Sequence, residues 1–491
     1  MTPALLAVLL AAHGAQPIAW SDWSDHVFAR ARKEDRFVLL DLGAVWCHWC
    51  HVMDETTYKD AQVAALVRAR FVPVRVDQDQ RPDLSNRYED YGWPATVVFD
   101  KSGAELVKLQ GYVPPARMAS LLKAIIDDPT PGPSVLGAGE PPVTPAALPR
   151  LSDAQRADLR GLLGSRYDHE QGGWGFTHKF LDWDAVEYCI LRARAGDERA
   201  GAMARETLAK QTKLVDPVWG GVYQYSDSGD WDHPHFEKIM QMQAENLRLF
   251  SLAYAEWKDP AHLKAARDIH RFLTTFLMSP EGAFYTSQDA DVVPGEHSAA
   301  YFALGDAERR RRGIPRVDMH RYARENAWAV NALVAFHAAT GADEPLRQAE
   351  RAARWIVANR ALPGGGFRHD ETDAAGPYLG DTVASGRAFL SLYRATNNAE
   401  WLRRAEDAAA FIASRFRAPG VAGFVTTAGG RPQRDENILV ARLGAGLAAA
   451  TGKVEHRALA EPAMRYLASA QIAPQPQTGG VLLADQELIA P

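Results

Sequence analysis

The sequence contains little cysteine, with 3 residues in a chain of 491. So few cysteines exclude a small domain held together by several disulfide bridges. Two of them, Cys47 and Cys50, are spaced as Cys-x-x-Cys, which is typical of a redox dithiol or of a metal site. The third, Cys189, lies in an apolar run, and we expect it to be an inert core residue.

The chain also lacks an excess of basic residues. A net charge of −6 and a pI near 6.2 argue against a nucleic-acid-binding surface. The one dense basic block, Glu308–Arg312, is interpreted as a solvated helix end. A composition of 47% hydrophobic and 24% charged residues is typical of globular proteins, and a chain of this length predicts two or more domains.

Long apolar runs are missing as well, so no membrane span is predicted. The apolar stretch Ala4–Ala12 is too short to cross a bilayer. Small residues follow it, and Ala12-His13-Gly14 would suit a signal peptidase, although basic residues ahead of the stretch are absent. We therefore expect residues 1–15 to be a signal peptide and the protein to be periplasmic or secreted. The alternative is an ordinary apolar extension on a cytoplasmic protein.

Residues 16–127 alternate between strand and helix patterns. Apolar strands are predicted at 37–42, 71–76, 95–99 and 105–107, with a helix from Cys47 past Met53 and a closing helix at Ala116–Ile126. This alternation indicates an α/β sheet domain. Residues 128–150 are rich in proline and glycine, and we interpret them as a linker.

Residues 151–491 have the pattern of long amphipathic helices separated by a repeated glycine-aromatic turn. The turns are predicted at Gly172–Phe176, Gly220–Tyr223, Gly282–Tyr285, Gly364–Phe367, Ala422–Phe424 and Gly479–Leu482. There is room for two helices between successive turns, and the long interval between Gly282 and Gly364 is interpreted as an insertion. Six turns predict an all-α, closed (α/α)6 toroid of helical hairpins, with an open solenoid as the alternative. The patterns indicate about eleven helices.

The Cys-x-x-Cys motif directly follows the strand at 37–42 and begins a helix. A helix N-terminus favours the thiolate, so Cys47 is predicted to attack with an exposed sulfur and Cys50, behind it, to resolve. Asp41, six residues before Cys47, is a candidate for proton transfer to Cys50. Pro94, after Gly92-Trp93, is expected to be cis and to lay its backbone beside the dithiol.

Two other interpretations of the motif remain open. Cys47-x-x-Cys50-His51 is also the c-type haem attachment pattern, although the preceding buried strand and Pro94 favour the dithiol. Zinc is disfavoured because the sequence has no second Cys-x-x-Cys. We expect no metal and no cofactor other than a redox-active disulfide between Cys47 and Cys50.

The residues around the motif resemble a known superfamily. Val45–Cys50 after Leu39-Leu40-Asp41 looks like the thioredoxin superfamily, and the longer string Cys47–Met53 is similar to the spermatogenesis-associated thioredoxin-like family and its bacterial relatives of unknown function. That resemblance implies a thioredoxin-like domain followed by a six-hairpin, glycosidase-like toroid. Similar strings in the second half are Pro234–Lys238, Ser287–Asp291, Glu325–Ala329 and Gly173–Phe176 with Lys179-Phe180. The sequence departs from the family at Tyr88–Tyr91, where a glycine-rich run is usual.

Several of the second-half strings are rich in titratable groups. In a toroid, loops at one rim converge on a central cavity, and the predicted pocket residues are Trp174, His235, Glu237, Lys238, Asp289, Asp291 and Glu325. Paired carboxylates there would suit general acid and base catalysis on a glycosidic bond, and His233 with His235 would suit proton abstraction as in sugar epimerases. Alternatively, these groups are helix caps and ion pairs between hairpins.

Three hypotheses follow. The first is a thiol–disulfide oxidoreductase whose toroid selects a client, with a protein thiol or disulfide as client or reductant. The second is a carbohydrate-active enzyme or sugar-binding protein with an accessory thioredoxin-like domain. The third is a scaffold in which neither site is catalytic. No nucleic-acid partner and no membrane span are expected.

Overall fold

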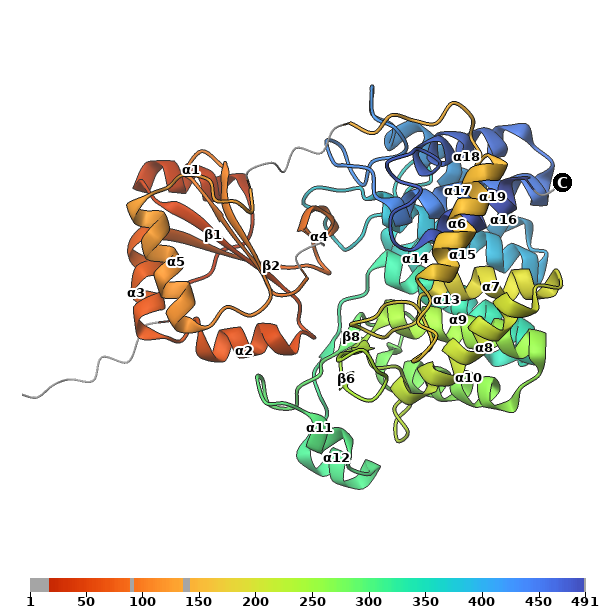
Figure 1. Ribbon diagram of the computed structural model, residues 1–491, viewed down its shortest axis with the longest axis horizontal. Coiled ribbons are helices and arrows are strands. Elements are labelled where there is room, and N and C mark those ends of the chain that lie inside the picture. Colours follow the sequence, from red (N-terminus) through yellow and green to blue (C-terminus); the bar gives the residue numbers. More distant parts are fainter. Residues whose placement is uncertain (1–16, 89–91, 136–141, 490–491) are drawn as a thin grey trace, which may run out of the picture. The chain divides into compact units, whose positions relative to one another are not determined.

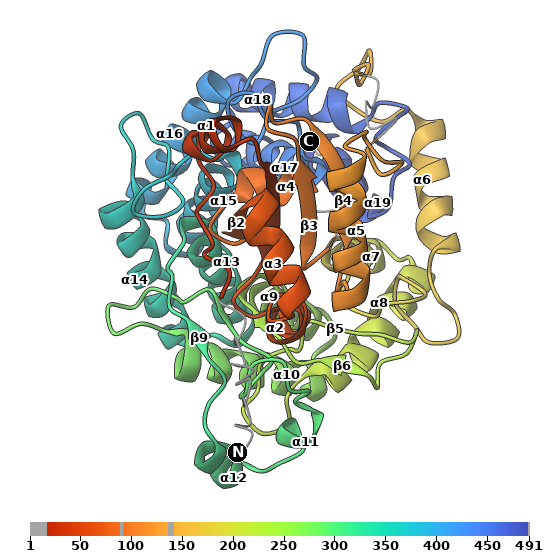
Figure 2. The same ribbon diagram turned by 90° about the vertical axis from the view of Figure 1, so that its left-hand side faces the viewer.

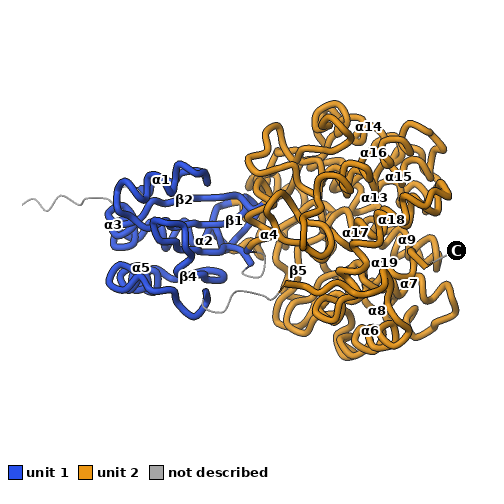
Figure 3. Tube along the Cα trace, turned by 90° about the horizontal axis from the view of Figure 1, so that it is seen from above, with its two compact units in different colours: residues 1–78, 88–140, 293–296 blue, residues 79–87, 141–292, 297–491 orange. Residues whose placement is uncertain are grey.

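The computed structural model describes residues 17–88, 92–135 and 142–489, so the predicted signal peptide lies outside the described residues. The chain divides into two compact units (Figure 3). The sheet unit comprises residues 1–78, 88–140 and 293–296, and the toroid unit comprises residues 79–87, 141–292 and 297–491. Within the described ranges, no helix has both the length and the apolar character that a bilayer crossing requires.

The sheet unit is built on four strands in the order β2-β1-β3-β4 (Figure 1). They are β1 Phe37–Gly43, β2 Phe71–Asp77, β3 Ala95–Phe99 and β4 Glu105–Gln110. Strands β1 and β2 are parallel, whereas β3 runs antiparallel to both β1 and β4. The central strands are apolar along nearly their whole length because helices and loops bury them on both faces.

The helices of this part of the chain are α1 Asp25–Glu34, α2 His48–Thr56, α3 Ala61–Arg70, α4 Pro82–Tyr88 and α5 Pro115–Asp127. Helices α3 and α5 pack on each other, and their apolar faces share one core with the sheet. Asp60 caps α3 by accepting hydrogen bonds from the backbone N–H groups of Gln62 and Val63. The predicted strands and helices of the α/β domain are therefore present, with bounds shifted by a few residues.

The toroid consists of an inner and an outer ring of helices (Figure 2). The inner helices are α7 Trp183–Arg194, α9 Met240–Trp257, α13 Ala323–Thr340, α15 Leu379–Thr396, α17 Arg434–Thr451 and α19 Thr478–Ile489. The outer helices are α6 Asp153–Ser165, α8 Glu198–Gln211, α10 Pro260–Phe272, α14 Asp343–Arg360, α16 Ala399–Arg415 and α18 Val454–Leu467. Each inner helix contacts two inner neighbours, and α19 contacts α7, so the ring is closed. The predicted (α/α)6 toroid is confirmed.

The last predicted turn was wrong, and so was the count of about eleven helices. Gly479 and Gly480 lie inside helix α19, so the two rings contain twelve helices among the described residues. A Cβ atom on Gly480 would lie 2.4 Å from the Asp184 carboxylate, and one on Gly479 would lie 2.6 Å from the Ala185 backbone. These glycines therefore allow α19 to pack closely on α7 and close the ring.

Four of the true turns are attached to the inner helix that follows them in the same way. In each case the side chain of the fourth residue of the inner helix forms a hydrogen bond with the backbone of a turn residue. That turn residue directly follows the last glycine or alanine of the turn. The pairs are Gln243 with Val222, Asn326 with Phe284, Thr382 with Phe367 and Asn437 with Phe424. We call these four residues the anchor residues. Because each anchor residue has the same position in its helix, α9, α13, α15 and α17 begin at the same depth in the ring.

The predicted insertion contains two short helices, α11 Ala299–Phe302 and α12 Asp306–Arg312, and the short strands β8 Ser287–Gln288 and β9 Val317–Asp318. Three further short strands, β5 Tyr225–Ser226, β6 Pro234–His235 and β7 Lys238–Ile239, precede it in the sequence. We call the five the rim strands. The interpretation of Glu308–Arg312 as a wholly solvated helix end was wrong at Arg309, which is fully buried. Its guanidinium donates to Asp216 at 2.7 Å, and Lys238 donates to the same carboxylate at 2.8 Å.

Candidate functional sites

The dithiol lies at the N-terminus of helix α2. Cys47 and Cys50 form a disulfide bond, with their Cα atoms 5.2 Å apart. Cys47 is the N-cap residue, and its sulfur accepts a hydrogen bond from the Cys50 backbone N–H at 3.1 Å. A sulfur in this position receives backbone N–H groups and the positive end of the helix dipole, which favour a thiolate after reduction.

The exposure of the two cysteines differs from the prediction. Cys47 is 4% exposed, whereas Cys50 is partly exposed. The Cys50 sulfur packs against strand β1, because a Cβ atom on Gly43 would lie 3.1 Å from it. Side chains two residues apart on a strand share a face, so Asp41 lies on the face of β1 that carries the dithiol, about 7 Å along the strand from Gly43.

Asp41 is buried and held by two partners. It accepts hydrogen bonds from Tyr58 Oη at 3.2 Å and from Arg75 Nε at 2.9 Å. Burial raises the pKa of the Asp41 carboxyl to about 6, against the lowering effect of the Arg75 guanidinium. Arg75 also pairs with Asp54 and stacks over the Trp20 ring at 4.3 Å. Asp41 can therefore gain or lose a proton near neutral pH.

Pro94 follows a cis peptide bond at the start of β3, as expected. Its carbonyl accepts a hydrogen bond from the Gly111 N–H at 2.8 Å, so this backbone group is used within the sheet unit. On helix α2, the His51 Nε2 atom lies 3.1 Å from the Val45 carbonyl oxygen, which ties the imidazole to the loop before the dithiol.

Two of the residues predicted for the toroid pocket lie in the packing between hairpins. Trp174 is 6% exposed, and its indole N–H donates to the Leu163 carbonyl at 2.9 Å. Lys238 is fully buried, bonds Asp216 and lies 4.4 Å from the centre of the Phe272 ring. Both polar groups are used by the protein, so we leave Trp174 and Lys238 out of the proposed site.

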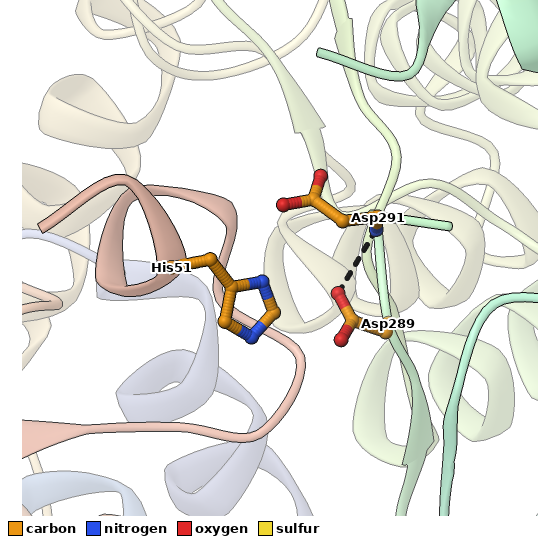
Figure 4. Close-up of side chains that lie close together, drawn as sticks. All are labelled: His51, Asp289 and Asp291. Atoms are coloured by element: carbon orange, nitrogen blue, oxygen red, sulfur yellow. Dashed lines mark hydrogen bonds between the residues drawn. The ribbon is translucent and has the colours of Figure 1, made fainter. Parts of the chain in front are cut away.

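Four predicted residues, namely His235, Glu237, Asp289 and Asp291, lie on the rim strands or beside them. The His235 ring stacks on Tyr225 with 4.2 Å between ring centres. Burial raises the pKa of the Tyr225 hydroxyl, and the Glu237 carboxylate raises it further, so Glu237 lies near this pair. After β8, the Asp291 N–H donates to the Asp289 carboxylate at 2.9 Å (Figure 4).

Glu325 lies in a cluster of ionisable groups within the toroid unit. It is the third residue of helix α13, and its partners His369 and Asp381 come from the turn before α15 and from α15 itself. One side-chain ligand atom from each of the three residues lies within 4.8 Å of the others. All three are buried, at 3%, 0% and 0% exposed. We call Glu325, His369 and Asp381 the rim cluster.

His369 is the cationic member of the rim cluster. Burial alone would lower the pKa of the imidazole, but the Asp381 carboxylate, 2.9 Å from Nδ1, raises it to about 9. Nε2 lies 2.7 Å from the Asp79 carbonyl oxygen, so both ring nitrogens face acceptors, as an imidazolium requires. The ring stacks on Tyr322 with 4.1 Å between centres.

The two acids of the rim cluster have oxygens without partners. Glu325 Oε2 and Asp381 Oδ2 are buried, and neither has a hydrogen-bond partner among the described residues. The same holds for the hydroxyl of Ser385, one turn after Asp381 on α15. Carboxylate oxygens accept hydrogen bonds, so the arrangement suits a ligand that presents O–H or N–H groups.

A neighbouring acid, Glu436, has a raised pKa. Burial raises the pKa of Glu436 to about 8, and the nearby Asp435 carboxyl contributes to this rise. Thr426 donates to Glu436 at 2.7 Å. Glu436 is the third residue of α17, as Glu325 and Asp381 are the third residues of α13 and α15. No local motif in the sequence marks His369 or Asp381.

Known proteins match both parts of the chain. Residues 6–126 match the thioredoxin-like DsbH family, described as a protein of unknown function, DUF255. Spermatogenesis-associated protein 20 of Rattus norvegicus is 29% identical over 315 aligned residues, which cover 57% of this chain and 40% of that protein. The chain thus spans less than half the length of this relative. Thioredoxin 1 of Chlorobaculum tepidum is 32% identical over 90 residues, covering 18% of this chain and 84% of that protein.

The toroid is similar to solved structures in fold. A sugar epimerase from a ruminal bacterium superposes with a TM-score of 0.51 at 10% identity, covering 64% of this chain and 86% of that one. At this identity the likeness concerns the fold alone. The two predicted folds, thioredoxin-like and six-hairpin, are both present in known relatives or neighbours.

Proposed function

We propose that this chain, which belongs to the spermatogenesis-associated thioredoxin-like family, is a thiol–disulfide oxidoreductase that uses Cys47 and Cys50. The observation that carries the proposal is the position of the Cys47 sulfur at the N-cap of α2, where the Cys50 N–H bonds it at 3.1 Å. A thiolate there is stabilised by the helix terminus and becomes the better nucleophile near neutral pH.

The reaction exchanges one disulfide for another. The Cys47 thiolate attacks a client disulfide, forms a mixed disulfide and releases one client thiolate. The Cys50 thiolate then attacks the Cys47 sulfur, releases the second client thiolate and leaves the Cys47–Cys50 disulfide. Two electrons and two protons have passed to the client, and an external dithiol restores the reduced protein. In this proposal Asp41, on the same face of β1, takes the proton of Cys50, which is supported by the rise of its carboxyl pKa to about 6.

Insulin reduction tests this proposal. The full chain with dithiothreitol should accelerate the precipitation of insulin, and Cys47→Ser and Cys50→Ser should each abolish the acceleration. Cys189→Ser is the matched control, because this buried thiol has its pKa raised to about 12 and should not take part. Activity that survives Cys47→Ser would refute the proposal.

A trapping experiment tests the order of the two sulfurs. Reduced Cys50→Ser protein should accumulate a mixed disulfide with a client that carries a disulfide, because the Cys47 thiolate attacks the client and the resolving thiol is missing. Cys47→Ser should not accumulate one. The reverse pattern would assign the attack to Cys50, the more exposed residue.

We propose as a second function that the toroid binds a sugar-like ligand at the rim cluster. The observation that favours it is the pair of buried oxygens, Glu325 Oε2 and Asp381 Oδ2, that lack partners among the described residues. Burying such acceptors costs free energy unless hydroxyl donors satisfy them. His369, whose pKa is raised to about 9, supplies a positive charge beside them. The predicted residues His235, Glu237, Asp289 and Asp291 stay candidates for the rest of the site.

Thermal shift with a panel of neutral monosaccharides tests this second function. A sugar that binds the rim cluster should raise the melting temperature of the full chain, and Glu325→Gln should abolish the shift. Glu308→Gln is the control, since Glu308 is an acid of the toroid unit outside the cluster. A shift that persists in Glu325→Gln would place the sugar elsewhere.

We also propose that residues 1–15 act as an export signal. The apolar stretch Ala4–Ala12 followed by Ala12-His13-Gly14 supports this. The N-terminal sequence of the protein purified from the periplasm should begin near Ala15, and recovery of an intact N-terminus from the cytosol would contradict it.

A further inference from the structure

The anchor residues define a layer of side chains deeper in the ring. Counting from the common start of four inner helices, the ninth residues are Arg248 in α9, Asn331 in α13, Arg387 in α15 and Arg442 in α17. Because the anchor residues hold these helices at the same depth, the three arginines form one layer inside the toroid. We call Arg248, Arg387 and Arg442 the arginine layer.

Two members of the arginine layer are paired with acids on other inner helices. Arg442 bonds Glu187 of α7 at 2.7 Å and Glu487 of α19 at 2.7 Å. Arg248 bonds the same Glu187 at 2.9 Å and Glu245 of its own helix at 2.7 Å. These pairs link α7, α9, α17 and α19 across the ring.

Arg387 is the member without a partner. Among the described residues, none forms a hydrogen bond or an ion pair with its guanidinium, and its side chain is partly exposed. Charges on four other inner helices act on it, namely Arg442, Glu487, Glu187 and Arg248. Because Arg387 on α15 interacts electrostatically with charged groups on α17, α19, α7 and α9, its side chain lies toward the axis of the ring. Burial lowers its pKa to about 10, with a further contribution from Arg442, so the group stays cationic at pH 7.

The arginine layer and the rim cluster lie at different depths along the same helices. Asp381 is the third residue of α15 and Arg387 the ninth, so they are separated by about 9 Å along the helix axis. The toroid thus carries buried acceptor oxygens without partners among the described residues at the level of Asp381, and a guanidinium without such a partner at the level of Arg387.

We propose that the ligand of the toroid is an anionic sugar, a polyhydroxylated molecule whose carboxylate or phosphate group pairs with Arg387. The planar guanidinium has donors in a fork that matches either anionic group in a bidentate manner. The inference rests on the second proposed function and adds to it a chemical class of ligand. The hydroxyl groups bond the oxygens of Glu325 and Asp381, and the anionic group reaches the arginine layer.

Isothermal titration calorimetry of the full chain tests this inference with D-glucuronate, D-glucose 6-phosphate, D-glucose and inorganic phosphate as probes. At least one anionic sugar should bind about 10-fold or more tightly than D-glucose, and Arg387→Met should lower its affinity by about 10-fold to 100-fold. Comparison of the two anionic sugars distinguishes a carboxylate from a phosphate. Arg394→Met is the control, because Arg394 lies on the same helix and bonds the Gly446 carbonyl.

Each other outcome overturns the inference in a recognisable way. Equal binding of D-glucose and both anionic sugars leaves the sugar proposal standing and refutes the role of Arg387. Inorganic phosphate that binds as tightly as the best sugar shows a simple anion site. No binding of any probe refutes the inference together with the second proposed function. An unfolding midpoint of Arg387→Met at or above that of the wild type excludes misfolding as the cause of lost binding.

Discussion

Two buried carboxylates, Asp41 in the sheet unit and Glu187 in the toroid, have pKa values shifted in opposite directions. In the sheet unit, Asp41 meets one guanidinium, that of Arg75, and the pKa of its carboxyl rises to about 6 because burial prevails. In the toroid, Glu187 meets two, those of Arg248 and Arg442, and these hold the pKa of its carboxyl far below the usual value although burial acts in the opposite direction. The number of cations in contact, rather than burial alone, decides whether a buried acid is charged.

The comparison suggests a division of labour. A buried acid with one cation titrates near neutral pH and can pass protons to a neighbouring thiol. A buried acid with two cations stays ionised and joins elements of the fold. Glu308, on the exposed face of α12, also has two arginines, Arg311 and Arg312, and so separates the effect of pairing from that of burial.

The largest effect should come from breaking the pairs of Glu187. Arg442→Met leaves Glu187 and Glu487 with one cation fewer in the ring and should destabilise the toroid by about 3–5 kcal/mol. Urea unfolding followed by far-UV circular dichroism measures it. Arg387→Met is the matched control, at the same position of the neighbouring helix without an ion pair, and should leave stability unchanged or raised. Equal losses in both variants would contradict the comparison.

A second expected effect concerns His369 and the pH. The pKa of His369 is about 9 in the folded protein and 6.5 in the unfolded chain. Its stabilising contribution to the free energy of unfolding is therefore fully present below pH 6.5 and is lost as the pH rises through 9. The toroid should lose about 3 kcal/mol of unfolding free energy across this range. The same unfolding assay at several pH values measures the loss. His369→Gln should remove this dependence, and a steep dependence retained in the variant would refute it.

Asp41 should give a somewhat smaller effect in the opposite region of pH. Its folded pKa of about 6 lies above the usual 3.8, so stability is greatest below pH 3.8 and falls as the pH rises through 6. Between pH 4 and pH 8 the wild type should lose about 2–3 kcal/mol of unfolding free energy through Asp41, and Asp41→Asn should remove this loss. Asp54→Asn should instead move the loss to lower pH, because the Asp54 charge raises the pKa of Asp41.

The smallest effect should come from Glu308. Arg311 and Arg312 lower the pKa of this exposed carboxyl to about 2, yet water screens the pairs. Glu308→Gln should leave the thermal midpoint unchanged at low and at high salt. A clear drop in the thermal midpoint would show that two arginines stabilise the fold through an exposed carboxylate. Burial would then not be needed to explain the stability that paired carboxylates give.

Much of the fold could be predicted because its signals are local. The strand before Cys47, the turn glycines and the amphipathic helices are each visible within about 20 residues. Helix α19 was missed because Gly479 and Gly480 have the composition of a turn, and only the close approach to α7 explains them. Trp174 was predicted to line a pocket because the sequence around a turn does not reveal whether its aromatic residue faces a cavity or is packed in the core.

The residues of the candidate sites also divide into those that a local sequence signal marks and those that it does not. Cys47, Cys50 and Asp41 come from one strand–helix segment and could be identified from it. His369 and Arg387 could not, because their significance depends on groups from other helices. Glu325 was found through the string around it, whereas its partner Asp381 has no comparable motif. Distances between helices decide these cases, and a single sequence does not contain them.

The anchor residues also give the toroid a common numbering. A position counted from Gln243, Asn326, Thr382 or Asn437 has the same height in each of four hairpins, so any substitution can be compared with its equivalents in the other three. Asn331 is the one ninth-position residue that is not an arginine. Asn331→Arg would therefore add a fourth guanidinium at a known height in the ring. Such a ring can be redesigned one level at a time.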